Sequence, residues 1–205
     1  SVLVVTPADH YVKDLHQFTR SMHEAIKAAK CKTIVTLGIN PTRPDTGFGY
    51  IHYEGDGMAK NVLTFKEKPE LDAAKQMIEQ GQHAWNGGMF IMQSQTWLYA
   101  IQQSNPKIYT SIEKAWQNKN KDQWFERSDA ELFKQSLSDS IDYAVMEKAK
   151  EIKIDVKLVV LNAGWSDLGS FDALDEIEKK DNNGNIFKGD VVSLNTRNTI
   201  AITSK

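Results

Sequence analysis

Near the start of the chain, apolar residues follow two different spacings. Residues 2–6 and 33–39 are continuous β-rich runs, which is typical of strands buried on both faces. Between these runs, apolar residues recur at three- and four-residue steps, as on one face of a helix: Leu15, Phe18, Met22, Ile26 and Ala29. Strand, helix and strand in this order indicate a right-handed crossover within a largely parallel sheet.

The middle of the chain alternates turn signals with short apolar segments. Residues 40–49 are rich in Pro, Gly, Asp and Thr and predict a loop. The Gly-Asp-Gly turn at residues 55–57 lies between two β-rich runs and predicts a hairpin. Residues 71–80 have helical spacing and are followed by Gly81, a common residue directly after a helix. Residues 90–92 are apolar enough for a central strand.

The remainder of the chain is more polar and less regular. Residues 94–150 have a helical pattern, in which three serines are placed to cap helix starts: Ser94, Ser128 and Ser140. Residues 157–162 predict a strand, and residues 170–180 predict a helix. Residues 186–203 alternate β-type residues with polar breaks, so we expect a second structural unit to begin there.

Composition narrows the classes of function. The 205 residues are 40% hydrophobic and carry a formal net charge of −2, from 25 basic and 27 acidic side chains. This balance argues against a nucleic-acid partner or a membrane-binding stripe, whereas a nucleotide site needs only a few local donors. Cys31 is the only cysteine, so no internal disulfide can form, which suits a reducing, cytoplasmic compartment. The apolar runs have strand length and are too short to span a bilayer.

Two aspartates follow predicted strands. Asp9 lies at the carboxyl end of the first strand, where open α/β sheets bind ligands. Asp167 lies between small residues just beyond the strand at 157–162. Together with water and substrate phosphates, two such carboxylates form a suitable Mg²⁺ site. Two alternatives remain open, because Asp9 can instead cap the following helix and the two aspartates can be unrelated.

Two further segments carry groups suited to a sugar phosphate. Glu67 can accept hydrogen bonds from vicinal hydroxyls and Lys68 can meet a phosphate, although a solvated strand end explains the same charges. Asn86 offers both a donor and an acceptor. Gly87 and Gly88 then permit a sharp bend or a close approach of the backbone to a ligand. A tight turn with Asn86 in a left-handed conformation is the competing interpretation.

Six segments together resemble the mannose-1-phosphate guanylyltransferases, a branch of the sugar-phosphate nucleotidylyltransferase family. The segments are PADH at 7–10, PTRPDTGFGY at 41–50, FKEKP at 65–69, WNGGMF at 85–90, SIDYAVMEK at 140–148 and GWSDLGS at 164–170. The resemblance covers nearly the whole chain in order and spacing. The motifs WNGGMF, SIDYAVMEK and GWSDLGS in this order are specific to the guanylyltransferase branch.

The resemblance implies a Rossmann-like α/β fold with a mixed, mostly parallel sheet sandwiched by helices. It implies a partial nucleotidyltransferase domain at 1–185 and the start of a C-terminal β-rich extension at 186–205. It also implies the site residues, namely Asp9 and Asp167 for catalytic Mg²⁺, Glu67 for sugar hydroxyls, Lys68 for the sugar phosphate, and Gly47, Gly49 and Asn86 for the mannose pocket. Asp142 lies in one of the motifs, where its expected role is limited to favouring a helix N-terminus.

The implied reaction forms GDP-mannose and pyrophosphate from GTP and mannose 1-phosphate by Mg²⁺-dependent in-line transfer, with Asp9, Lys68 and Asp167 as its catalytic residues. One alternative is a sugar-phosphate-binding fragment without catalysis. Another is a pyrophosphorylase for a different sugar 1-phosphate or nucleotide. A homodimer is left open.

The chain departs from the family pattern in two places. The family's glycine-rich, basic nucleotide-binding loop has no counterpart here, and the chain opens abruptly on a strand at Ser1. We therefore expect an N-terminally truncated fold whose missing residues include that loop. Phe48 stands where an aromatic hydroxyl is common in the family, which removes one sugar contact.

Overall fold

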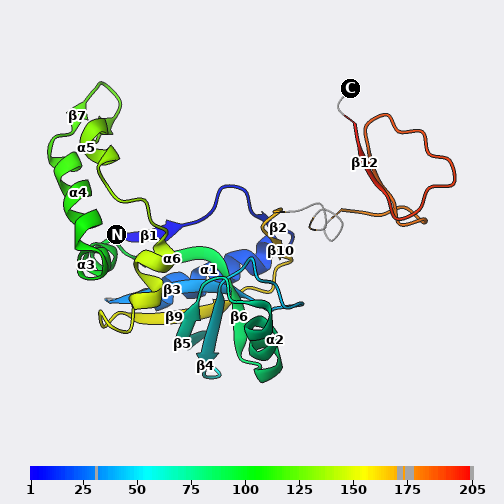
Figure 1. Cartoon of the computed structure of the whole chain (residues 1–205), viewed down its shortest axis with the longest axis horizontal. Coiled ribbons are helices and arrows are strands. Elements are labelled where there is room, and N and C mark those ends of the chain that lie inside the picture. Colours follow the sequence, from blue (N-terminus) through cyan, green and yellow to red (C-terminus); the bar gives the residue numbers. More distant parts are fainter. Residues whose placement is uncertain (31, 170–172, 174–177, 204–205) are drawn as a thin grey trace. The chain divides into compact units, whose positions relative to one another are not determined.

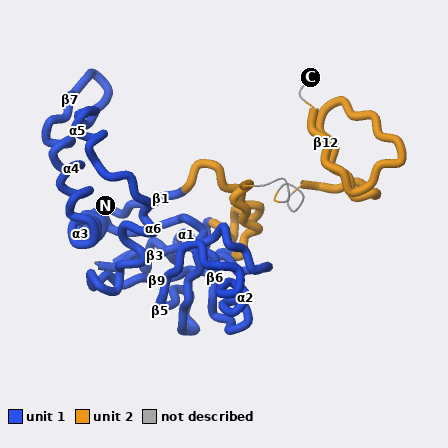
Figure 2. The backbone as a smooth tube through the Cα atoms, in the orientation of Figure 1, with its two compact units in different colours: residues 1–6, 19–161 blue, residues 7–18, 162–205 orange. Residues whose placement is uncertain are grey.

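The structure of the chain is a computed structural model. It describes residues 1–30, 32–169, 173 and 178–203. Cys31 and most of the helix expected at 170–180 therefore lie outside the described residues. The chain divides into two compact units, which Figure 2 colours separately: unit 1, formed by Ser1–Thr6 and Thr19–Leu161, and unit 2, formed by Pro7–Phe18 and Asn162–Lys205.

A six-stranded sheet forms the centre of unit 1 (Figure 1). Its strands are β1 (Val2–Val5), β3 (Thr33–Ile39), β4 (Tyr50–Glu54), β5 (Ala59–Lys66), β6 (His83–Gln93) and β9 (Asp155–Val160). They lie in the order β1-β6-β3-β9-β5-β4, and the first residues of β6 also pair with β4. The expected loop at 40–49 and the expected hairpin, formed by β4 and β5, are both confirmed.

The sheet is mixed, as expected of this α/β fold, but its neighbouring strands are mostly antiparallel. Within the described residues, β3 and β9 form its one parallel pair. β6 runs against β1, β3 and β4, and β5 runs against β4 and β9. The other four strands therefore point the same way, with β5 and β6 inserted among them. β1 and β3 thus run parallel to each other, as expected, but they are not neighbours, because the antiparallel strand β6 lies between them.

β1 lies at an edge of the sheet, which corrects the expectation that this strand is buried on both faces. Among the described strands it pairs with β6 alone, and Val4 is 46% exposed. In contrast, all seven residues of β3 are buried between β6 and β9. Both segments have the same β-branched, apolar character, so composition alone does not separate an edge strand from a central one.

The helical segments of unit 1 that follow α1 (Leu15–Ala28) are α2 (Leu71–Gln80), α3 (Ser94–Ser104), α4 (Pro106–Gln117), α5 (Ala130–Lys134), α6 (Ile141–Ala144) and the 3₁₀ helix η1 (Met146–Lys148). α2, α3 and η1 contact strands of the sheet, whereas α4 packs on α3 and α5 packs on α4. A short hairpin of β7 (Asn120–Lys121) and β8 (Glu126–Arg127) follows α4. The main core cluster joins β3, β6 and β9 to α3 and η1 through apolar side chains that include Ile34, Phe90, Met92, Ile101, Met146 and Val156.

Of the three serines expected to cap helices, Ser140 does so at α6. Asp129 caps α5 in place of Ser128, and Ser94 is already the first residue of α3. Gly81 follows α2 with a φ of 70°, as expected of a residue that ends a helix.

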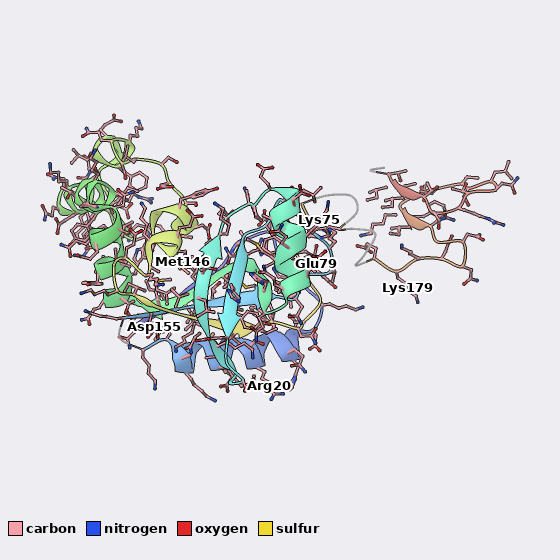
Figure 3. All side chains as sticks on the ribbon, turned by 60° about the horizontal axis from the view of Figure 1, so that its bottom comes forward. Arg20, Lys75, Glu79, Met146, Asp155 and Lys179 are labelled. Atoms are coloured by element: carbon pink, nitrogen blue, oxygen red, sulfur yellow. The ribbon has the colours of Figure 1, made fainter. Side chains whose placement is uncertain are left out.

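The helix predicted after β1 is α1 (Leu15–Ala28), but its buried residues differ from the expected apolar stripe. Ser21 and Ala25 are buried, whereas Leu15 is 69% exposed. Figure 3 shows α1, marked by Arg20, along one side of the sheet and the segment of Met146 along the other. Asp14 Oδ1 accepts the Gln17 N–H at 3.0 Å and so caps this helix. The alternative role of Asp9 as its cap is therefore wrong.

Unit 2 contains two small strand pairs. β2 (Tyr11–Val12) pairs antiparallel with β10 (Trp165–Ser166), and β11 (Ile186–Lys188) pairs parallel with β12 (Ile200–Ile202). A turn precedes β11, in which Asp181 Oδ1 accepts the Asn185 N–H at 2.8 Å. The domain boundary at residue 185 stays a prediction. No described helix combines the length and apolar character that crossing a bilayer requires.

Candidate active site

The backbone around Asn86 belongs to a continuous strand, so the competing interpretation of a tight turn is wrong. The Asn86 N–H donates to the Gly49 carbonyl at 2.7 Å, which joins β6 to the end of the 40–49 loop. A carbon added at Gly87 would lie 2.7 Å from the Leu37 carbonyl oxygen, and Gly88 has a φ of 67°. The close approach that these glycines permit is therefore to β3, where the register of the ladder shifts.

Three hydrogen bonds orient the side-chain amide of Asn86. Its Oδ1 accepts from Thr36 Oγ1 and from the Gly88 N–H, each at 3.2 Å. Its Nδ2 donates to Asp142 Oδ1 at 2.9 Å. Because both oxygen contacts are donors and the nitrogen contact is an acceptor, the orientation of the amide is fixed by its surroundings. The second Nδ2 hydrogen has no protein acceptor in the described part of the chain and can serve a ligand.

Glu67 follows β5 and places its carboxylate against Gly49. A carbon added at Gly49 would collide with Glu67 Oε2, so the glycine makes room for this oxygen. Among the described residues, Glu67 Oε2 is buried without a hydrogen-bond partner. The Glu67 N–H donates to Glu147 Oε1 at 3.2 Å. A buried acceptor without a donor is costly to the fold, and a hydroxyl of a bound ligand would satisfy it.

The carboxyl groups of Glu67 and Asp142 both have raised pKa values. Burial is the main cause for Glu67, and the negative charges of Asp142 and Glu147 raise its pKa further, while Lys68 lowers it. Burial likewise raises the pKa of Asp142, against the hydrogen bond from Asn86 and the charge of Lys68, which both lower it. Two carboxyl groups close to Asn86 are thus partly withdrawn from water, and Lys68 is an opposing positive charge.

Lys68 lines a polar cavity of about 660 Å³, together with the segment that contains Arg43 and Asp45. Its φ of 43° shows that regular strand geometry has ended at Lys68. The Gly47 N–H donates to Asp45 Oδ1 at 2.8 Å, which ties Gly47 to the loop lining this cavity. Arg43 forms an ion pair with Asp45 at 3.0 Å. A lysine and an arginine therefore both line this cavity.

Asp9 and Asp167 flank the β2–β10 ladder in unit 2 at the same end. Ser166 pairs with Tyr11, so Asp167 comes one residue after the ladder and Asp9 two residues before it. In an antiparallel pair, these two positions lie at the same end. Asp167 Oδ1 accepts the Gly169 N–H at 3.2 Å, which helps to orient its carboxylate.

Contacts outside the ladder hold these two segments together. Trp165 Nε1 donates to His10 Nδ1 at 3.1 Å, and the two rings meet edge to face at 5.1 Å. The N–H groups of Lys13 and Asp14 donate to the Ala163 carbonyl at 3.1 and 2.9 Å. The positions of Asp9 and Asp167 are therefore set by more than the two ladder pairs.

The donors at this end of the ladder fit a hard divalent cation. Mg²⁺ prefers oxygen ligands and commonly takes one or two carboxylates, with water and substrate phosphates completing its shell. The described residues contain no group of three or more His, Cys, Asp or Glu that could hold a metal. Asp9 and Asp167 are two carboxylates at one end of the ladder, and carboxylate oxygens are ligands that Mg²⁺ accepts.

The sequence did not predict that Thr36 and Asp142 contact the side chain of Asn86. Asp142 lies in the first turn of α6, next to the cap formed by Ser140, as expected. Its contact with Asn86 comes from a segment 56 positions away and has no local signature. Thr36 did carry a signal, because it is a polar residue in the middle of an apolar run, although Thr33 at the start of the same buried strand is polar too.

Comparison with known proteins identifies related sequences. A model of the nucleotidyl transferase family matches residues 1–184. A mannose-1-phosphate guanylyltransferase from Salmonella montevideo is 40% identical over 206 residues, which cover 97% of this chain and 43% of that protein. The xanthan biosynthesis protein XanB from Xanthomonas campestris pv. campestris (strain B100) is 39% identical over 204 residues, which cover 100% of this chain and 43% of that protein.

A solved structure agrees with this relationship. The crystal structure described as mannose-1-phosphate geranyltransferase from Thermus thermophilus has a TM-score of 0.78 and 31% sequence identity, and the match covers 90% of this chain and 52% of that chain. The present chain spans 43% of the length of the two relatives above. Since the family model matches most of the sequence, the chain belongs to the nucleotidyl transferase family.

Proposed function

We propose that this chain carries the sugar-phosphate-binding part of a mannose-1-phosphate guanylyltransferase, which forms GDP-mannose and pyrophosphate from mannose 1-phosphate and GTP. Family membership and a relative of that name support the reaction class and the substrates. One structural observation carries the sugar assignment, namely the buried and unpartnered Glu67 Oε2 beside the oriented amide of Asn86.

In this proposal, the pocket of unit 1 recognises the sugar through complementary polar groups. Glu67 Oε2 accepts a hydrogen bond from a sugar hydroxyl, and the remaining Nδ2 hydrogen of Asn86 donates to a sugar oxygen. Gly49 keeps the space that the carboxylate of Glu67 needs. Lys68 binds the phosphate of the sugar as a point charge, at the cavity it shares with Gly47's loop.

The proposed reaction needs no covalent intermediate on the protein. A phosphate oxygen of mannose 1-phosphate attacks the α-phosphorus of GTP, the bond from that phosphorus to the bridging oxygen breaks, and pyrophosphate leaves. The work of the protein is to position the two phosphates and to neutralise their charge. Asp9 and Asp167 would hold Mg²⁺ through their carboxylate oxygens. When bound, the cation supplies charge stabilisation at the reacting phosphates.

A pyrophosphate-release assay with the full-length protein tests this function. We expect release with mannose 1-phosphate, GTP and Mg²⁺ to exceed that with glucose 1-phosphate or with ATP and UTP, and chelation of the metal to abolish it. Preference for another pair would overturn the substrate assignment. Calorimetry with mannose 1-phosphate alone distinguishes a binding fragment, which binds without turnover, from a protein that does not recognise the sugar at all.

The Asn86→Ala variant tests the sugar pocket within that assay. It should raise the KM for mannose 1-phosphate at least about tenfold while leaving the KM for GTP unchanged, because one buried hydrogen-bond donor to the sugar is lost. Asn61→Ala is the matched control, since Asn61 lies on β5 and is exposed. An equal rise in both KM values would contradict the assignment of Asn86 to the sugar.

A further inference from the structure

Asp142 joins the two groups that are proposed to bind the sugar. Its Oδ1 accepts from Asn86 Nδ2 at 2.9 Å, and its charge acts on Glu67. It comes from α6, whereas Asn86 lies on β6 and Glu67 follows β5. Asp142 is itself partly buried, and burial is the main reason for its raised pKa. A partly buried acid beside a second acid opposes stability, so its presence calls for a role beyond the start of a four-residue helix.

The first consequence of Asp142 concerns the amide of Asn86. Thr36 Oγ1 and the Gly88 N–H both donate to Asn86 Oδ1, and Asp142 accepts from Nδ2. An acceptor on the nitrogen side and donors on the oxygen side select one of the two amide orientations. Asp142 thereby determines where the second Nδ2 hydrogen points.

The second consequence concerns Glu67. The charge of Asp142 raises the pKa of Glu67, but Asp142 is not a hydrogen-bond partner of Glu67 Oε2. Glu67 Oε2 therefore has no donor among the described residues and is open to a ligand beside the oriented amide of Asn86.

We propose that Asp142 is a positioning residue that makes this pocket select ligands with neighbouring hydroxyl donors, such as the vicinal diol of a hexose. This inference rests on the proposed function, because the ligand is the sugar of the sugar 1-phosphate. Asp142 holds the amide of Asn86 in place, and the oxygen of the second recognition group, Glu67 Oε2, is unpaired among the described residues. A ligand that lacks the hydroxyl meeting Glu67 leaves a buried carboxylate oxygen unsatisfied, and sites built around a hydroxyl reject such analogues strongly.

Asp142→Asn tests this role, with Asp139→Asn as a matched control. Asp139 lies three residues earlier, is exposed, and is not among the groups that shift the pKa of Glu67. In Asp142→Asn we expect the pKa of Glu67 to fall, because a nearby negative charge that raises it is removed. Carbon-13 NMR of the Glu67 carboxyl group, titrated in the free protein, measures this change. Asp139→Asn should leave the titration unchanged.

Ligand discrimination is the second readout. Calorimetry should show the wild type binding mannose 1-phosphate far more tightly than at least one of its mono-deoxy analogues. In Asp142→Asn, affinity for mannose 1-phosphate should fall about tenfold, and the ratio between the two ligands should shrink, because the amide of Asn86 loses the charged acceptor that holds its orientation beside Glu67. An unchanged Glu67 titration, or an unchanged affinity ratio, would overturn the positioning role. A purely structural role would lower the melting temperature without moving either quantity.

The outcomes separate this inference from the proposed function. If the wild type does not bind mannose 1-phosphate, the proposed function fails, while the Glu67 titration still tests the effect of Asp142. If Asp142→Asn does not fold, the wild type provides a second measurement. Its affinity ratio between mannose 1-phosphate and the deoxy analogue should fall as the pH decreases through the raised pKa of Glu67. Both ligands carry the same phosphate, so protonation of that phosphate changes both affinities alike and does not change their ratio. A ratio independent of pH would overturn the inference.

Discussion

Replacing Glu67 by glutamine should stabilise the protein at pH 8 while weakening its binding of mannose 1-phosphate. The reason is the buried Glu67 Oε2, which has no donor among the described residues and lies under the influence of Asp142 and Glu147. Glutamine removes the negative charge and can turn its amide hydrogens toward those acids. It also removes the ionised acceptor that the sugar hydroxyl needs.

The size of the stability gain follows from the cost of an unsatisfied buried group. That cost is about 1–3 kcal/mol, and partial exposure of Glu67 places the expected gain near the lower limit, at about 1 kcal/mol. For a chain of this length, about 1 kcal/mol corresponds to roughly 2–4 °C in melting temperature.

The pH dependence has a defined sign. Because burial and neighbouring charges raise the pKa of Glu67, the folded protein binds this proton more tightly than the unfolded chain. Wild-type stability therefore falls as the pH rises through the folded-state pKa, and the full penalty is present above it. Below the unfolded pKa of about 4.3 the carboxyl is protonated in both states, so the advantage of Glu67→Gln should disappear there.

Thermal unfolding at pH 8 and at pH 4, followed by circular dichroism, measures both effects. Glu70→Gln is the control, since Glu70 is exposed and makes no side-chain cap to α2. A Glu67→Gln variant that is less stable than the wild type at pH 8 would refute the reasoning. A gain of equal size at both pH values would refute it too, since the benefit would then have nothing to do with ionisation. Calorimetry of the same samples should show the accompanying loss of sugar affinity.

Three further substitutions have defined outcomes. Asp167→Asn should lower Mg²⁺-dependent pyrophosphate release at least about 100-fold with an unchanged melting temperature, and near-normal release would exclude Asp167 from the metal site. Gly49→Ala should displace Glu67, because the added methyl group would collide with Glu67 Oε2. Urea titration should show a free energy of unfolding lower by about 1–3 kcal/mol, and calorimetry a weaker affinity for mannose 1-phosphate. An unchanged affinity would contradict this steric argument. Asp14→Ala should lower the free energy of unfolding by about 1 kcal/mol in the same urea titration, because the cap of α1 is lost, whereas Asp9→Ala should leave it unchanged. A larger loss of stability in Asp9→Ala would show that Asp9 caps the helix.

The local elements were predictable because local physics decides them. The strand at β3, the β4–β5 hairpin and the helix ended by Gly81 follow from runs of apolar residues, turn residues and capping. The exposure of β1 and the antiparallel neighbours were not predictable. Both follow from β6, a strand from much later in the chain that inserts beside β1 and β3.

The candidate site divides in the same way. Glu67 and Asn86 could be singled out from motifs, and the structure brings both against Gly49. Asp142 could not be given its contact with Asn86, since that contact depends on how α6 packs against the sheet and not on residues near either one in sequence. The glycines after Asn86 predict a close approach to a ligand or a bend, but the group that comes close to Gly87 is the carbonyl oxygen of Leu37 on β3.

The pairing of Asp9 with Asp167 on one cation is tested most directly by paramagnetic NMR with Mn²⁺, which accepts the same oxygen ligands as Mg²⁺. Substoichiometric Mn²⁺, with mannose 1-phosphate present, should broaden the resonances of Asp9 and Asp167 together. Asp167→Asn should then abolish the broadening at Asp9, because neither carboxylate holds the ion alone. Broadening at Asp9 that survives this substitution unchanged would show that the two aspartates do not share a metal.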